Sequence, residues 1–249
     1  MAWTSVASRG TATAIAAGAT LSVSPLVEIP VGAIAVVVCG SHSNQTGSGE
    51  TTLHAVSDTA GNTWTRLRER SLSGTLLNGD VDDTNTSSLW ATKITSAIGT
   101  GASVTLNTGD AASEGKIIGL YEFSVVAGQT FGIAAGASAS AFQADTTVTV
   151  SGLSSVERLW IGCGAVSHSG ATLTQDADYT DMFGADLPAH TGAIPTSVKS
   201  RPGYRIATLT TDTFGWTFGG RDTTLLLVAL DEVAAPSVGQ PTMRRVQWY

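Results

Sequence analysis

Two Ser-His-Ser triplets, Ser41–Ser43 and Ser167–Ser169, are the part of this sequence that comes closest to a catalytic motif. A serine activated by a histidine is a common nucleophile in acyl-transfer enzymes. Adjacent residues of a strand point to opposite faces of a sheet, so neither triplet can form a Ser–His hydrogen bond within one strand. The chain also lacks the G-x-S-x-G nucleophile elbow. We therefore expect no nucleophilic catalysis at either triplet.

Metal chemistry and sugar hydrolysis find little support in the residue pattern. No H-x-H, HExxH or CxxC spacing occurs. The histidines are scattered along the chain: His42, His54, His168 and His190. Glycosidases need two carboxylates facing one cleft, and the pair Glu122 and Asp231 is explained more simply as the polar ends of two core strands. We expect no catalytic residue and no cofactor, and hence a protein that is not an enzyme.

The segment GDVDDTN, residues 79–85, offers a second metal hypothesis. Asp80, Asp82 and Asp83 place hard oxygen ligands close together, as calcium sites do. Their spacing matches no known calcium motif, and an acidic solvated turn explains the same residues. We favour the turn, so no metal site is predicted.

Aromatic residues occur within the strand-like segments, where they suit a core better than a sugar-binding platform. They are Trp64, Trp90, Trp160, Tyr204, Trp216 and Phe218. An exposed row of them would favour carbohydrate binding instead. The two cysteines, Cys39 and Cys163, have equivalent sequence surroundings and are predicted to be buried free thiols on central strands, with a disulfide between them as the alternative.

An internal repeat organises the chain around these residues. The blocks at residues 31–43, 58–67, 87–96, 103–109 and 116–124 recur in the same order at 156–169, 174–184, 202–211, 215–221 and 223–232. The offset between matching blocks varies, which indicates conserved strands joined by loops of variable length. No window has the period of an amphipathic helix. The sequence therefore predicts an all-β antiparallel β-sandwich, jelly-roll or immunoglobulin-like, with a pseudo-duplicated strand order.

Strand positions follow from the hydrophobic pattern. Continuous apolar runs within residues 36–40, 117–123, 159–164 and 225–230 predict central strands. Alternating segments, SVTLNT at 103–108 and TVTVSG at 147–152, predict edge strands, as does the stretch 11–24. The expected boundaries are an extended N-terminal segment 1–24, one sandwich domain 25–233 and an extended tail 234–249. Two polar insertions, 44–52 and 72–86, are expected to be exposed loops. A third insertion, 184–199, interrupts the second copy of the repeat.

The amino-acid composition limits the classes of partner that the protein can bind. Only 13% of the residues are charged, against roughly 25% in typical soluble proteins, so the polar surface must consist mainly of hydroxyl, amide and glycine residues. The formal net charge of −7 argues against nucleic acid as a partner. No signal peptide and no stretch suited to membrane insertion is visible. This composition favours an extracellular or virion protein, made in the host cytoplasm and released within a particle.

The segment after residue 233 is the candidate partner-binding element. Prolines keep it extended, and tryptophan, tyrosine and arginine are the residues that carry most interface energy. The candidate residues are Pro236, Pro241, Arg244, Arg245, Trp248 and Tyr249. A segment with incidental aromatics is the alternative to a tether that docks into a neighbouring subunit.

The order of blocks resembles a β-sandwich domain of bacteriophage structural proteins and of some bacterial surface proteins. The features that carry the resemblance are D-x-x-G-N-T-W-T at 58–65, Leu89-Trp90, the strand ending Tyr121-Glu122-Phe123, and Gly203-Tyr204-Arg205. It implies a virion structural protein (minor capsid, decoration, fibre or tail-associated) that contacts copies of itself and other virion proteins. The alternatives are a carbohydrate-binding or host-receptor domain that uses its long loops on a host-surface glycan, and a polysaccharide hydrolase.

Overall fold

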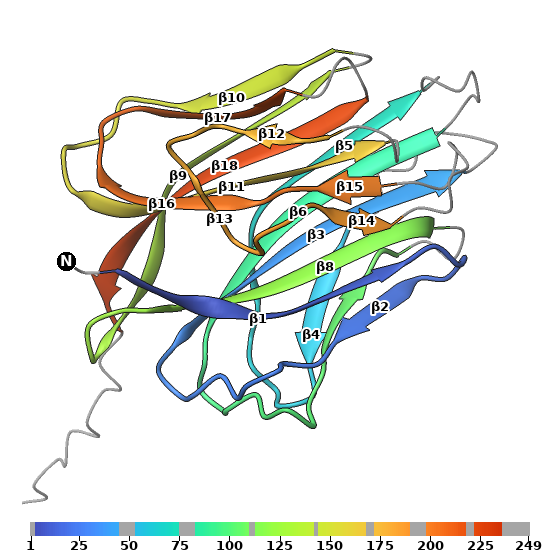
Figure 1. The fold of residues 1–249 in the computed structure, drawn as a ribbon. Helices are drawn as coiled ribbons and strands as arrows, with labels where there is room; N and C mark the ends of the chain where they lie inside the picture. Colours follow the sequence, from blue (N-terminus) through green and yellow to red (C-terminus); the bar gives the residue numbers. More distant parts are fainter. Residues whose placement is uncertain are drawn as a thin grey trace, which may run out of the picture.

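The structure, a computed structural model, describes residues 3–44, 53–74, 83–109, 113–141, 144–167, 172–189, 198–217 and 222–235. All regular secondary structure in these ranges is β-strand, and every strand pairing is antiparallel. The strands form four sheets that stack as layers (Figure 1). The predicted all-β sandwich architecture is confirmed. Within these ranges, no helix is long and apolar enough to span a membrane.

Sheet A, the first of the two large sheets, comes entirely from the first half of the chain. Its strands, in spatial order, are β1 (Thr4–Ala14), β8 (Ser113–Ser124), β3 (Ile34–Asn44), β6 (Asp83–Lys93) and β5 (Thr65–Gly74). The continuous apolar runs of β3 and β8 occupy inner positions, as predicted. The N-terminal segment supplies the edge strand β1, which pairs with β8 along its length.

Sheet D, the second large sheet, repeats this order with strands from the second half. Its corresponding strands are β9 (Gln129–Ala141), β18 (Thr223–Ala234), β11 (Glu157–Ser167), β16 (Gly203–Thr208) and β13 (Thr180–Asp181). The hairpin of β14 (Leu187–Ala189) and β15 (Val198–Ser200) is added to β11. It lies in the third insertion, which therefore contributes strands as well as the residues 190–197 outside the described ranges.

Two three-stranded sheets cover the outer faces and follow the same duplication. Sheet B has the order β2 (Thr20–Val23), β7 (Val104–Asn107) and β4 (Ala55–Asp58). Sheet E has the order β10 (Thr146–Val150), β17 (Asp212–Thr217) and β12 (Thr174–Gln175). All eight strands of the first half thus have a counterpart at the same place in the second, so the sequence repeat is a repeat of topology.

Apolar side chains fill the three spaces between the layers. Sheets A and D enclose a cluster with Trp3, Phe123 and Ile161. Sheets A and B enclose a second cluster around Trp90, and sheets D and E a third around Trp160. The inner strands are buried on both faces, which explains their uninterrupted apolar sequences.

Two details of the predicted strand map are wrong. The segment 103–108 was predicted as an edge strand, but β7 is the middle strand of sheet B. Its alternation arises because sheet B has one face on the core and the other in solvent, so the pattern reports one-sided burial and not an edge position. The predicted exposed loop 72–86 is shorter than expected, since Leu72 and Thr86 lie buried in β5 and β6.

Candidate functional site

A buried serine–histidine chain lies at one end of the space between sheets A and B. Nε2 of His54, just before β4, lies 2.8 Å from Oγ of Ser41 on β3. The other ring nitrogen, Nδ1, lies 2.7 Å from Oγ of Ser88 on β6, and the indole N–H of Trp90 donates to the same hydroxyl oxygen at 3.0 Å. The two nitrogens of one imidazole are thus each held by a serine, which is the geometry of a nucleophile, a base and an orienting group.

The surroundings of this chain favour a structural role. Ser41 and His54 are each 2% exposed, so a substrate cannot reach the hydroxyl. Burial, with a smaller contribution from the Arg66 charge, lowers the pKa of His54 to about 3. An imidazole with that pKa is a poor general base near neutral pH, where catalytic bases have a pKa close to the working pH. These hydrogen bonds provide partners for polar side chains that are buried inside the sandwich.

The other candidate site residues from the sequence also have structural roles. Glu122 lies 2.6 Å from Nη2 of Arg9, and Asp231 lies 2.7 Å from Nε of Arg158, so these carboxylates form ion pairs on different strands. The described aromatic candidates are core residues: Trp90, Trp160 and Trp216 are buried, and Trp64 and Tyr204 pack partly buried against the clusters.

Both cysteines are buried free thiols on the inner strands β3 and β11, as predicted, so the alternative disulfide is not formed. Burial raises the pKa of each thiol well above its usual range. Reactive cysteines need the opposite, a lowered pKa and access to solvent. Among the described residues, no group of three or more His, Cys, Asp and Glu side chains is arranged to hold a metal ion.

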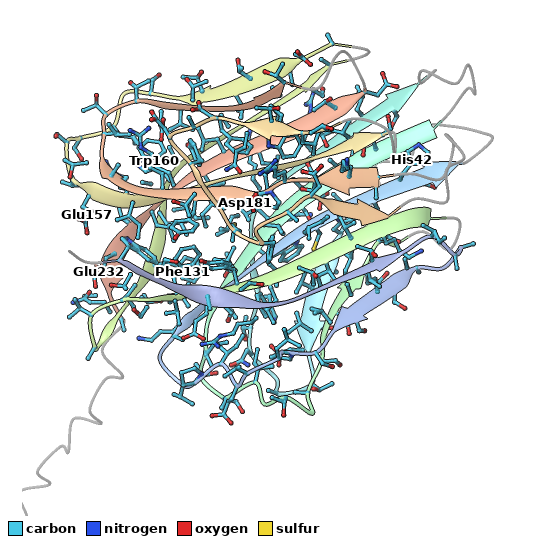
Figure 2. The ribbon with its side chains drawn as sticks, viewed as in Figure 1. His42, Phe131, Glu157, Trp160, Asp181 and Glu232 are labelled. Atoms are coloured by element: carbon cyan, nitrogen blue, oxygen red, sulfur yellow. The ribbon has the colours of Figure 1, made fainter. Side chains whose placement is uncertain are left out.

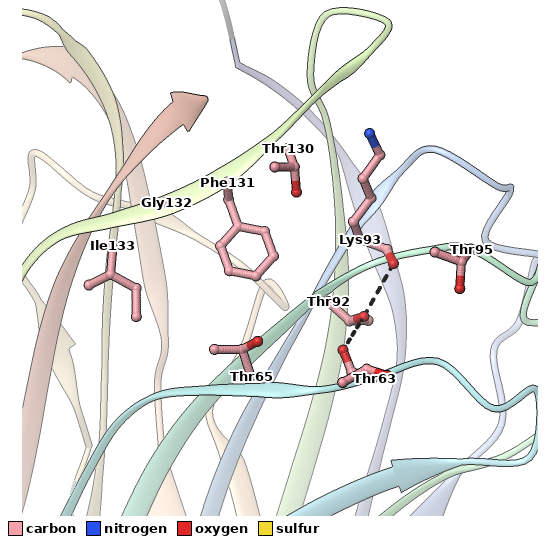
Figure 3. Close-up of a pocket in the computed structure, with 9 residues that line it drawn as sticks. All are labelled: Thr63, Thr65, Thr92, Lys93, Thr95, Thr130, Phe131, Gly132 and Ile133. Carbon is pink, nitrogen blue, oxygen red and sulfur yellow. Dashed lines mark hydrogen bonds between the residues drawn. The ribbon is translucent and has the colours of Figure 1, made fainter. Parts of the chain in front are cut away.

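A hydroxyl-lined pocket of about 470 Å³ opens where the starts of β5 and β9 meet the end of β6. Its lining residues are Thr63, Thr65, Thr92, Lys93, Thr95, Thr130, Phe131, Gly132 and Ile133. Figure 3 shows the Phe131 ring pointing into this space toward Thr65, with Lys93 and Thr130 beside it. The Thr92 hydroxyl donates to the Thr63 carbonyl oxygen at 2.7 Å, and the Lys93 ammonium donates to the Gln129 carbonyl oxygen.

A row of arginine and serine side chains continues from this pocket. Arg70 on β5 donates from Nη2 to Oγ of Ser140 on β9 at 2.8 Å, and Nη2 of Arg68 lies 3.5 Å from Oγ of Ser138. These contacts place β5 and β9, edge strands of sheets A and D, side by side. We call the pocket and this row together the β5–β9 seam. Figure 2 shows that Phe131 lies near Glu232 at one end of the stack and that His42 lies at the other.

Several predicted residues lie outside the described ranges. They are His168, His190, Phe218, Asp80 and Asp82, and the whole tail set Pro236, Pro241, Arg244, Arg245, Trp248 and Tyr249. The partner-binding role of the tail therefore stays a prediction.

Sequence reasoning missed both the Ser41–His54 contact and the seam. Ser41 lies on β3 and His54 lies 13 residues later, just before β4 of another sheet, so no local spacing signals their contact. Arg70 and Ser140 are 70 residues apart and meet only because two edge strands pack together. The alternation of Arg66, Arg68 and Arg70 was the one visible signal, but a β-bulge places Arg66 on the opposite face of β5 from the other two arginines.

Comparison of the chain with protein-family models, with curated proteins and with solved structures found no match, so the sequence and the geometry alone carry the functional argument.

Proposed function

We propose that this chain is a structural, non-enzymatic subunit of a bacteriophage particle, a minor capsid, decoration, fibre or tail-associated protein that assembles by docking onto neighbouring subunits. The nucleophile–base geometry at Ser41 and His54 is closed to substrates, which supports a role without catalysis. Stacked sheets with three apolar cores make a rigid spacer, a property that a particle component needs.

One observation carries the assembly part of the proposal. Three valines are exposed at the same end of the stack: Val6 in β1, Val126 in the turn after β8 and Val233 near the end of β18, at 44%, 53% and 37%. The Ala235 amide donates to the Gly128 carbonyl oxygen at 3.1 Å, so the described part of the chain ends beside them. The start of β1 and the end of β18 lie together in Figure 1.

The segment 236–249 has the length and composition for a tether. If Pro236 and Pro241 keep it extended, its 14 residues span up to about 40 Å, enough to reach across a contact onto a neighbouring subunit. Trp248 and Tyr249 would then be buried in that subunit, and each side chain covers on the order of 150 to 250 Å². The valine end would lie at the contact from which the tether departs.

Light scattering on the full chain and on a chain that ends at Ala235 tests this proposal. We expect the full chain to assemble and the shortened chain to be a folded monomer with an unchanged β-sheet circular-dichroism spectrum. A full-length Trp248→Ala/Tyr249→Ala variant should behave like the shortened chain. If all three proteins have the same oligomeric state, the tail is not a tether and the proposal fails.

A further inference from the structure

We propose that the β5–β9 seam binds an acidic polysaccharide, one whose sugar units carry carboxylates. The pocket would seat one sugar unit, and the arginines would hold carboxylates of the units that follow. This inference goes beyond the proposed function. The pocket lies next to the valine end, because its lining residue Thr130 pairs with Val233, and the arginine row extends away from that end along β9.

The charge distribution is the first support. Most described cations are neutralised by an acid within the chain, as Arg9 is by Glu122 and Arg201 by Asp181. Arg68, Arg70 and Lys93 differ: within the described ranges no carboxylate lies within 4.0 Å of them, and their hydrogen-bond partners are neutral oxygens. Three cations without an acidic partner thus share one seam of a protein whose net charge is −7.

The direction of the side chains is the second support. Opposite residues of paired strands share a face, so Arg68 and Arg70 of β5 lie on the face of Leu89 and Ser87, toward sheet D. Arg66 lies on the opposite face, where its guanidinium is 5.8 Å from the Trp90 ring centroid. A β-bulge between Arg66 and Arg68 sets this arrangement, because the extra residue changes the alternation.

The chemistry of the lining selects sugar as the ligand class. Threonine and serine hydroxyls both donate and accept hydrogen bonds, as sugar hydroxyls require. Phe131 offers an apolar ring face for the C–H side of a pyranose, and a volume of about 470 Å³ is within the range of small-ligand pockets. A guanidinium matches a carboxylate in its planar, two-pronged geometry. The seam runs about 17 Å from Thr65 to Arg70, at ~3.3 Å per strand residue.

The same observations disfavour nucleic acid. Binding of single strands needs successive exposed aromatic platforms, and Phe131 is the one aromatic side chain among the described residues that line the pocket. A uronate polymer instead brings hydroxyls to match the threonines.

Calorimetry with an oligogalacturonate and its fully methyl-esterified counterpart tests the inference, because esterification removes the charge of each carboxylate and leaves the ring hydroxyls unchanged. We expect the acid form to bind, more weakly as salt rises, and the ester to bind at least tenfold more weakly. Arg68→Gln/Arg70→Gln should weaken binding of the acid form by about tenfold, since each exposed pair contributes modestly. Arg66→Gln, on the same strand but the opposite face, should change the affinity less than twofold.

Lys93→Met provides a second variant at the pocket end, should the double arginine variant fail to fold, and should weaken binding severalfold. Equal affinity for acid and ester would overturn the proposal, and so would an equal loss on Arg66→Gln. Binding of a single-stranded oligodeoxynucleotide without binding of oligogalacturonate would assign the seam to nucleic acid. Absence of binding to either sugar at millimolar concentration would also sink the inference, without bearing on the tether.

Discussion

Asn85 on β6 donates from Nδ2 to the backbone carbonyl oxygen of Ala165 on β11 at 2.9 Å, and so joins the two halves of the molecule across the space between sheets A and D. The same nitrogen also donates to the Asp222 carbonyl oxygen at 3.2 Å. Asn85 is fully buried, so water cannot replace it as the donor. The Asn85 side chain therefore forms a polar contact within the otherwise apolar interface between sheets A and D.

Asn85→Ala should therefore lower the free energy of unfolding by about 2 to 3 kcal/mol, because two buried carbonyl groups lose a donor. Urea unfolding followed by tryptophan fluorescence measures the change. Thr149→Val on the exposed face of β10 is the control and should stay within about 0.5 kcal/mol of the parent chain. If Asn85→Ala lowers the free energy of unfolding no more than the control does, the Asn85 hydrogen bonds contribute nothing to stability.

Stability should fall as the pH drops below neutrality, because two buried histidines are held neutral. Burial lowers the pKa of His42 to about 4 and of His54 to about 3, whereas both titrate near 6.5 in the unfolded chain. Below pH 6.5 the unfolded state thus binds more protons than the folded state. Stability that is fully present above pH 6.5 is lost on acidification, with a slope approaching 1.4 kcal/mol per pH unit for each histidine.

His54→Gln isolates one of the two contributions. Urea unfolding at several pH values between 7 and 5 should give a slope shallower than that of the parent chain by up to about 1.4 kcal/mol per pH unit. The comparison of slopes is independent of how much the substitution destabilises the protein at pH 7. Identical slopes would mean that His54 is not held neutral.

Gly162 on β11 should tolerate no side chain. A Cβ at this position would lie 2.2 Å from the ring of Phe214, which packs between sheets D and E. Gly162→Ala should cost about 1 to 3 kcal/mol of unfolding free energy through overpacking. Gly99→Ala, where a Cβ would meet no atom within 4 Å, is the matched control and should be near neutral. Comparable midpoints of thermal unfolding for the two variants would contradict the close packing.

The ion pair of Arg9 and Glu122 should stabilise the edge strand β1. Glu122 is only 4% exposed, so Arg9→Met would leave a buried carboxylate without its partner, at a cost of about 3 to 5 kcal/mol. The double variant Arg9→Met/Glu122→Leu should recover most of that loss, because it removes both charges. A double-mutant cycle by chemical denaturation measures the coupling. A double variant as unstable as the single one would assign the loss to packing instead.

Most of the fold can be predicted from the sequence, because buried strands have recognisable hydrophobic patterns and because the sequence blocks repeat. The apolar runs of β3 and β8 identify strands buried on both faces, and the repeated blocks identify their counterparts β11 and β18. The position of β7 was predicted wrongly because alternation follows exposure of one face and carries no information on neighbouring strands. Contacts such as Arg70 with Ser140 depend on the packing of separate sheets, which no periodicity within one strand encodes.

The turn from Val125 to Gly128, between β8 and β9, carries the chain from the eight described strands of the first half to the ten of the second. A chain cut there would give two fragments that each expose a wide apolar face, since the large sheets cover one another. Such fragments should recombine like complementary halves and aggregate when kept apart.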